Sequence, residues 1–357
     1  MIALPPIGVS LAGLLAGFAC GFFVWRARLC SFGAIEDALI GHDWRRMKVF
    51  ALALSVALAG TQALVLGGMF DASATTYLPL RVAVISAALG SLLFGFGMAM
   101  VGTCAFGSLV RLGGGDLRSL ITLIVFGGLA YATLRGVLGP VRLQVFEPLA
   151  IEMPGPVPGS LAHLLRQLDL AGLAAPTGLL VAAALAIWAL TDSRLRRARR
   201  LLTSGIVLGL GVLAGWVATG VLVDEFSGAS RPQSLTFVAP VGRALFGFLI
   251  ADGGWGDFGV ASVAGVALGA YAAAKLADEF RWEAYDDQRE MRRHIGGAVL
   301  MGFGGVLAGG CTIGQGLTAG SVLALTWPIT VAGLILGARL GIAVLMEGGL
   351  RGWFQRE

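Results

Sequence analysis

The chain has 357 residues, of which 57% are hydrophobic and only 13% charged, and it carries a formal net charge of +5 at pH 7. A soluble protein of this length would have about 25% charged residues, so the composition excludes a soluble globular protein and predicts an all-α polytopic membrane protein in the lipid bilayer. The positive charge lies in loops, where arginines orient a membrane protein, and it gives no reason to expect nucleic-acid binding.

Four membrane spans are predicted in the first half of the chain, each with about 20 apolar residues, the number that crosses the hydrocarbon core. They cover residues 8–25, 49–69, 82–103 and 119–138. The first has no basic region before it and no clean cleavage site, so we expect a retained span and not a signal peptide. Residues 26–37 are too few and too polar to cross, and we interpret them as a re-entrant segment with Cys30 near its tip.

A proline-rich segment over 139–171 separates the two halves, and we predict that it is an interfacial linker. The second half predicts five spans, at residues 172–191, 203–223, 258–274, 297–316 and 321–343. Two prolines break the apolar segment Ser230–Ile250, which we interpret as a second re-entrant piece. The predicted organisation is a first repeat over 1–138, the linker, a second repeat over 172–345 and a cytoplasmic tail over 346–357.

The strongest internal signal is a repeated apolar motif. Residues 297–316 read GAVLMGFGGVLAGGCTIGQG, with eight glycines and one cysteine, and residues 90–107 read GSLLFGFGMAMVGTCAFG. A shift of 207 positions without a gap superimposes Cys104 on Cys311 within a shared lattice of glycines. Glycines let helices approach closely. The Gly-Gly-Cys-Thr-Ile-Gly cluster predicts a helix break, and the backbone groups that the break leaves free must be buried in protein or line a polar cavity. We infer a duplication with two broken helices, each presenting a thiol.

The basic clusters give the expected orientation. Residues 45–48, 194–200 and 289–293 all fall on one side of the membrane if the N-terminus lies outside. The positive-inside rule makes that side cytoplasmic and places the C-terminus there too. The first broken helix then runs inward and the second outward, so the repeats are antiparallel. This is the inverted-repeat plan of many secondary transporters, whose site lies near the midplane at the repeat interface.

Three of the four cysteines lie at or near the predicted breaks, and they define the candidate site: Cys30, Cys104 and Cys311. A buried neutral thiol is a weak hydrogen-bond donor and acceptor, and free N–H groups at helix breaks favour anions. We therefore predict a weak, multi-step path for a small anion with a soft, sulfur-like atom. Arg28 and Arg231 lie beside the re-entrant pieces, where they are expected to attract the anion. The supporting positions at the breaks are Thr103, Thr312, Gln315, Gly310 and Gly314.

Simpler interpretations of the same residues stay open. Close helix packing explains the glycines equally well. Thr312 and Gln315 could serve only to hydrogen-bond the backbone groups that a helix break leaves without partners. Arg28 could serve only as a positively charged anchor at the cytoplasmic surface. Cys20 lies in a continuous apolar span and is expected to serve packing.

Two other function classes are kept as alternatives. A membrane thiol oxidoreductase or sulfur transferase would use the same cysteines, but the chain has no CxxC motif and no nearby base to lower the pKa of a thiol. A copper path would use soft ligands, but histidines are scarce and few methionines lie near the breaks. We predict no enzyme, no cofactor and no metal site, since no Cys/His metal spacing occurs.

At these residues the sequence resembles the YeeE/YedE family of sulfur-compound membrane transporters. The similarity is carried by residues 302–321 (GFGGVLAGGCTIGQGLTAGS), by the Trp-Pro-Ile-Thr-Val-Ala-Gly run that starts at Trp327, by residues 95–107, and by Arg-x-Arg-Leu-Cys within 26–37. It covers nearly the whole chain and is weakest over 139–170.

The resemblance implies an hourglass-like, pseudo-two-fold protein of the bacterial inner membrane that imports thiosulfate, passed between thiols through S–H···S contacts. It implies that Cys30, Cys104 and Cys311 match the three functional cysteines of the family, whereas Cys20 has no counterpart. It also implies a separate cytoplasmic sulfur-carrier protein of the TusA type, because this sequence contains no such domain and no Cys-Pro motif. Related branches are linked to selenium metabolism, so a selenium compound is the alternative substrate.

Overall fold

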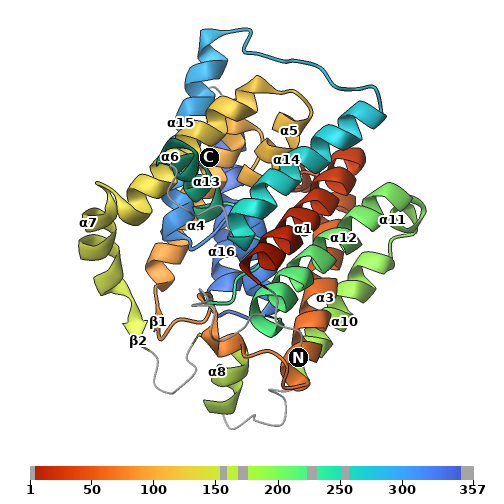
Figure 1. Ribbon diagram of the computed structural model, residues 1–357, viewed down its shortest axis with the longest axis vertical. Helices are drawn as coiled ribbons and strands as arrows, with labels where there is room; N and C mark the ends of the chain where they lie inside the picture. Colours follow the sequence, from red (N-terminus) through yellow and green to blue (C-terminus); the bar gives the residue numbers. More distant parts are fainter. Residues whose placement is uncertain (1–4, 153–158, 168–175, 223–230, 251–256, 347–357) are drawn as a thin grey trace, which may run out of the picture.

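The computed structural model describes residues 5–152, 159–167, 176–222, 231–250 and 257–346, and these residues are mainly helical (Figure 1). Two short strands, β1 (Arg81–Val82) and β2 (Ile151–Glu152), pair antiparallel. All but the first residue of the predicted tail, and parts of the predicted linker, lie outside the described residues.

The first half of the chain forms long helices that are interrupted by two short ones. The six are α1 (Pro6–Ala27), α2 (Ser31–Leu39), α3 (Arg45–Leu66), α4 (Val84–Val101), α5 (Ala105–Gly113) and α6 (Leu117–Arg135). A 3₁₀ turn, Ala72–Ala74, lies between α3 and α4. After α6 come α7 (Gly139–Val141), a π-helical turn (Arg142–Phe146) and a 3₁₀ turn (Glu147–Leu149).

The second half has a similar mixture of long and short helices. Its first elements are α8 (Leu161–Gln167), α10 (Thr177–Leu190), α11 (Ser193–Arg197) and α12 (Arg199–Trp216), which continues as a π-helical turn (Val217–Val221). Its last elements are α13 (Ala239–Ile250), α14 (Phe258–Leu276), α15 (Gln288–Leu307), a π-helical segment (Gly314–Ala319) and α16 (Thr326–Met346).

Seven helical stretches of the described chain are long and apolar enough to cross a membrane, so the polytopic all-α class is confirmed. The predicted count of nine spans is not, because the helices at two predicted spans are not among the seven. α10 has 14 residues and is about 21 Å long, less than the ~30 Å thickness of the hydrocarbon core. α15 has 20 residues, but its first turns, from Gln288 to Arg293, are largely charged or polar.

Glycines bring α1 and α14 together along their whole length. A Cβ added at Gly13, Gly17 or Gly21 would overlap the backbone of Phe258, Ser262 or Val266, respectively. Both series advance by four residues per step, so the two helices run parallel with their backbones in direct contact. This is the small-residue packing that membrane helices use where lipid and protein are equally apolar.

The helices that precede the two cysteine motifs, α4 and α15, cross in opposite directions. A Cβ at Gly90 would lie 2.7 Å from the carbonyl oxygen of Gly304, and one at Gly97 would lie 2.6 Å from that of Gly297. α16 lies on the other side of α4 and runs parallel to it, with Gly337 packed on the Leu92 carbonyl group. The helical parts of the two repeated segments, 90–107 and 297–316, therefore pack against each other in the bundle.

The ends of the bundle differ in charge. In Figure 1 the start of α15 lies at the top and the arginine-rich α11 at the right-hand edge, whereas α8 and the β1–β2 pair lie at the lower end. We call these the basic end and the opposite end. Between them, one apolar core contains Cys104 and Cys311 together with the large buried side chains of Trp216, Phe94 and Phe126.

Candidate functional site

The first cysteine motif breaks a helix at Gly102. α4 ends at Val101, Gly102 turns the chain with a left-handed φ of 77°, and α5 starts at Ala105 with Cys104 as its N-cap. The backbone N–H of Gly107 donates to the Cys104 sulfur at 3.4 Å. The first N–H groups of a helix have no partner within it, and here the thiol sulfur accepts from one of them.

The second motif repeats this arrangement. α15 ends at Leu307, Gly309 has a left-handed φ of 75°, and helical structure resumes at Thr312, immediately after Cys311. The backbone N–H of Gly314 donates to the Cys311 sulfur at 3.4 Å. The helix breaks predicted from the glycine and cysteine pattern therefore occur in both motifs. Both thiols are fully buried and do not face lipid.

Cys30 lies at the third break. Arg28 ends α1 with a left-handed φ of 50°, and Cys30 is the N-cap of α2. The Cys30 sulfur lies 3.5 Å from the Thr103 hydroxyl oxygen, so it contacts the first cysteine motif across 73 residues of chain. The segment 26–37, predicted to be re-entrant, therefore has its cysteine beside the first broken helix.

A pair of hydroxyl groups links these breaks to the second motif. The Ser31 hydroxyl donates to the Thr312 hydroxyl at 3.2 Å, and both groups lie within hydrogen-bonding reach of the Cys104 thiol. α2, α5 and the helix that begins at Thr312 all start at this cluster. The positive ends of three helix dipoles thus converge on two thiols and three hydroxyls.

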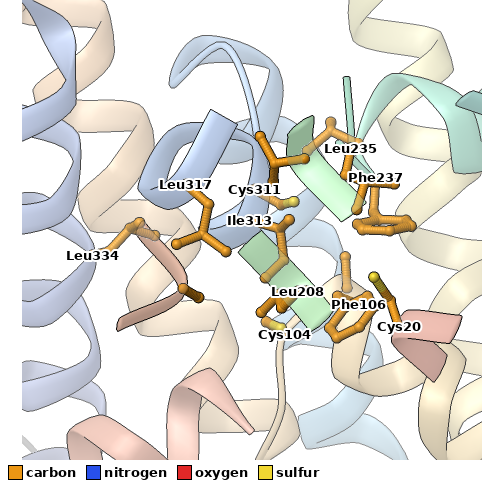
Figure 2. Packing of buried hydrophobic residues seen from close by; sticks show 14 of the residues in the cluster. Cys20, Cys104, Phe106, Leu208, Leu235, Phe237, Cys311, Ile313, Leu317 and Leu334 are labelled. Carbon is orange, nitrogen blue, oxygen red and sulfur yellow. The ribbon is translucent and has the colours of Figure 1, made fainter. Parts of the chain in front are cut away.

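Cys311 lies toward the other side of this cluster. Figure 2 shows its sulfur on the same buried core as Cys104, with the fully buried Ile313 drawn between the two thiols. Next to Cys311, Gly314 lies against the hydroxyl groups of Thr236 and Tyr77, because a Cβ there would come within 2.5 Å and 3.3 Å of them. Gly314 thus leaves room for two hydroxyls that sequence analysis did not identify.

A cavity of about 350 Å³ adjoins the second motif. It is lined by Gly310, Arg231, Arg243, Gln233 and Thr236, among others. Arg243 is ion-paired with Asp257, the N-cap of α14, at 2.5 Å. Two predicted positions, Gly310 and Arg231, therefore lie in one cavity. Arg243 was missed, although a second arginine in the apolar segment Ser230–Ile250, besides Arg231, was a signal for it.

A second arginine-lined cavity, of about 520 Å³, lies at the other end of α14. Its walls include Arg26, Arg28 and Arg200. The Arg28 guanidinium is 77% exposed and pairs at 3.0 Å with Glu279, which follows α14. Arg28 therefore belongs to the surface of the basic end and does not lie in the thiol cluster, as the anchoring interpretation also expects.

Gln315 and Cys20 have packing and hydrogen-bond contacts that explain their burial. Gln315 is buried, accepts a hydrogen bond from Thr330 of α16 at 3.4 Å, and has its amide nitrogen against Gly309. Cys20 is buried between α1 and α12, where its thiol points at the Val207 carbonyl oxygen at 3.8 Å. Gln315 thus supports the second break, and Cys20 is a packing cysteine outside the cluster.

Buried thiols and helix starts inside a bundle of membrane-crossing helices, with a charged cavity toward each end, are the arrangement expected of a membrane transport protein. The chain belongs to the sulphur-transport family, whose model matches residues 26–340. It is 29% identical over 352 residues to the thiosulfate transporter TsuA of Escherichia coli K12, with 92% of each chain covered. It is 28% identical over 338 residues to the thiosulfate transporter TsuA of Spirochaeta thermophila, with 91% of this chain and 96% of that one covered.

Proposed function

We propose that this protein takes up thiosulfate across the bacterial inner membrane and that Cys30, Cys104 and Cys311 contact the anion in turn. The observation that carries the proposal is the junction of the three breaks through the Cys30–Thr103 and Ser31–Thr312 contacts. The names of the two similar transporters support thiosulfate as the substrate.

The chemistry of the cluster suits a soft dianion that must not bind too tightly. Helix N-termini offset part of the cost of removing the anion from water, and the hydroxyls of Thr103 and Thr312 donate to its oxygens. A neutral thiol adds only a weak S–H contact to the terminal sulfur. Weak successive contacts let the anion leave each position, as conduction requires.

The internal repeat gives the path its expected symmetry. The Gly90–Gly304 contact becomes the Gly97–Gly297 contact when each residue is shifted by 207 positions into the other repeat. The same shift relates the two thiol caps, with equal N–H to sulfur distances of 3.4 Å. These relations support two inverted repeats, within 1–138 and 172–345, whose helix breaks meet near the midplane.

Two arginine-lined cavities, one with Arg231 and Arg243 and one with Arg26 and Arg28, fit an entrance and an exit. The concentration of arginine at the basic end supports a cytoplasmic location for it, an external N-terminus and a cytoplasmic C-terminus. The cavity of Arg231 and Arg243 is then the external entrance, and that of Arg26 and Arg28 lies at the cytoplasmic exit. A TusA-like sulfur carrier would receive the imported sulfur at the latter.

The test is uptake of labelled thiosulfate into cells that lack other thiosulfate transporters and express this chain. We expect unlabelled thiosulfate to suppress the uptake, and an equal concentration of sulfate or selenate to leave it largely unchanged. Absence of thiosulfate uptake by correctly inserted protein would refute the proposal. Equal competition by selenate would favour the selenium alternative.

A further inference from the structure

An apolar pocket of about 180 Å³ lies in the flank of the bundle, outside the two arginine-lined cavities. α2, α3, α10, α16 and the helix that starts at Thr312 form its walls. Ser31 and Thr312 are the hydroxyl-bearing residues of its lining, and they are the same pair that links the thiol cluster. The pocket therefore reaches from the side of the protein to the residues that contact Cys104.

The pocket is continuous with surface that faces the bilayer. On α10 the side chains of Leu180, Ile187 and Trp188 are 61%, 64% and 41% exposed, and on α16 Leu336 is 52% exposed. Apolar side chains so exposed on membrane helices contact acyl chains. An empty apolar void loses dispersion contacts and does not hold water, so an acyl chain is the occupant that such a pocket favours.

The mouth of the pocket lies beside positive charge. Met47 and Phe50 of its lining belong to the first turns of α3, which begins at Arg45. Lys48 lies 5.9 Å from the centre of the Trp188 ring and pairs with Asp192, the N-cap of the arginine-rich α11. Lys48 is balanced by Asp192 and Arg45 by Asp43, so the excess positive charge at this mouth comes from Arg194, Arg196 and Arg197 of α11. This excess suits a phosphate group at the membrane surface, where an exposed tryptophan is also typical.

We propose that this pocket binds one acyl chain of an anionic phospholipid, with its phosphate at the start of α3 and the chain end against Ser31 and Thr312. The bound chain fills the gap beside the thiol cluster from the lipid side. The site depends on the pocket and its basic mouth and not on the identity of the transported anion.

The experiment uses the full chain in vesicles of phosphatidylethanolamine and a phosphatidylglycerol with a diazirine in one acyl chain. After irradiation, adducts are mapped by mass spectrometry. Bulk lipid does not reach Leu54, Leu317 and Leu334 of the pocket wall, since they are only 5%, 2% and 5% exposed. We expect adducts on these leucines and none on Leu208, which is fully buried elsewhere. Figure 2 shows Leu317 and Leu334 on one side of the core and labels Leu208 nearer to Cys104.

Two variants separate binding in the pocket from general contact with lipid. Ala51→Phe adds a ring inside the pocket, and we expect it to abolish the adducts on Leu54, Leu317 and Leu334. Ala183→Phe adds the same ring on the exposed face of α10 and should leave those adducts unchanged. Adducts confined to exposed residues in the wild type would overturn the proposal, whether or not Ala51→Phe folds. Adducts that persist in folded Ala51→Phe would also overturn it.

Discussion

The crossing of α4 and α15 predicts the effect of a single added methyl group. A Cβ at Gly97 would lie 2.6 Å from the Gly297 carbonyl oxygen, 2.8 Å from Met301 Cγ and 3.0 Å from the Met301 nitrogen. Two of these three atoms are backbone, so relief requires the helices to separate. Overpacking of this kind costs about 1–3 kcal/mol, against a gain of ~1 kcal/mol from the helix propensity of alanine. We expect Gly97→Ala to lower the free energy of unfolding by up to about 2 kcal/mol.

The assay is thermal unfolding of the purified protein in detergent, followed by circular dichroism. Gly128→Ala on α6 is the matched control, because Gly128 is exposed and a Cβ there meets nothing within 4 Å. It should leave the midpoint unchanged or raise it. Gly304→Ala meets the Gly90 carbonyl oxygen at 2.6 Å and should be as harmful as Gly97→Ala. A Gly97→Ala variant as stable as Gly128→Ala would refute the reasoning.

Three further predictions follow from contacts elsewhere. Arg243→Gln should raise the KM for thiosulfate uptake several-fold, since it removes a charge from the proposed entrance; an unchanged KM would argue against that entrance. Ser31→Ala and Thr312→Val should each cost about 1 kcal/mol of stability, and the double variant about as much as one of them, because both lose the same hydrogen bond; additive losses in unfolding would contradict this. The Lys48 hydrogen bond holds the pKa of Asp192 below its usual value, so this stabilisation is present above about pH 4 and lost on acidification. The difference in melting temperature between wild type and Asp192→Asn should therefore shrink from about pH 6 to pH 3, and a constant difference would count against it.

The helix breaks were predictable because their signal is local. Glycine tolerates the left-handed turn at residues 102 and 309, and each cysteine follows that turn by two positions. The pattern thus predicted that Cys104 and Cys311 lie at helix breaks. The spacing does not determine which anion contacts the two cysteines, so the identity of the anion stays a prediction.

Other features depend on contacts between distant segments. The hydroxyls of Tyr77 and Thr236 meet at Gly314, although they come from different loops, and the sequence has no signal that joins them. The predicted count of nine spans is not confirmed, because hydropathy alone does not determine helix length. α10 is apolar but has only 14 residues. Arg28 was predicted to attract the anion beside the re-entrant segment; its pairing with Glu279, 251 residues away, has no signal in the sequence.

The central claim is that the buried thiols of the two broken helices contact the moving anion. Its most direct test is uptake of labelled thiosulfate by cells with equal membrane levels of Cys104→Ala, Cys311→Ala and Cys20→Ala. Cys20 is the matched control, since it is equally buried but packs between α1 and α12. We predict that uptake is lost in the first two variants and stays close to wild type in the third. Undiminished uptake by folded Cys104→Ala and Cys311→Ala would contradict the claim.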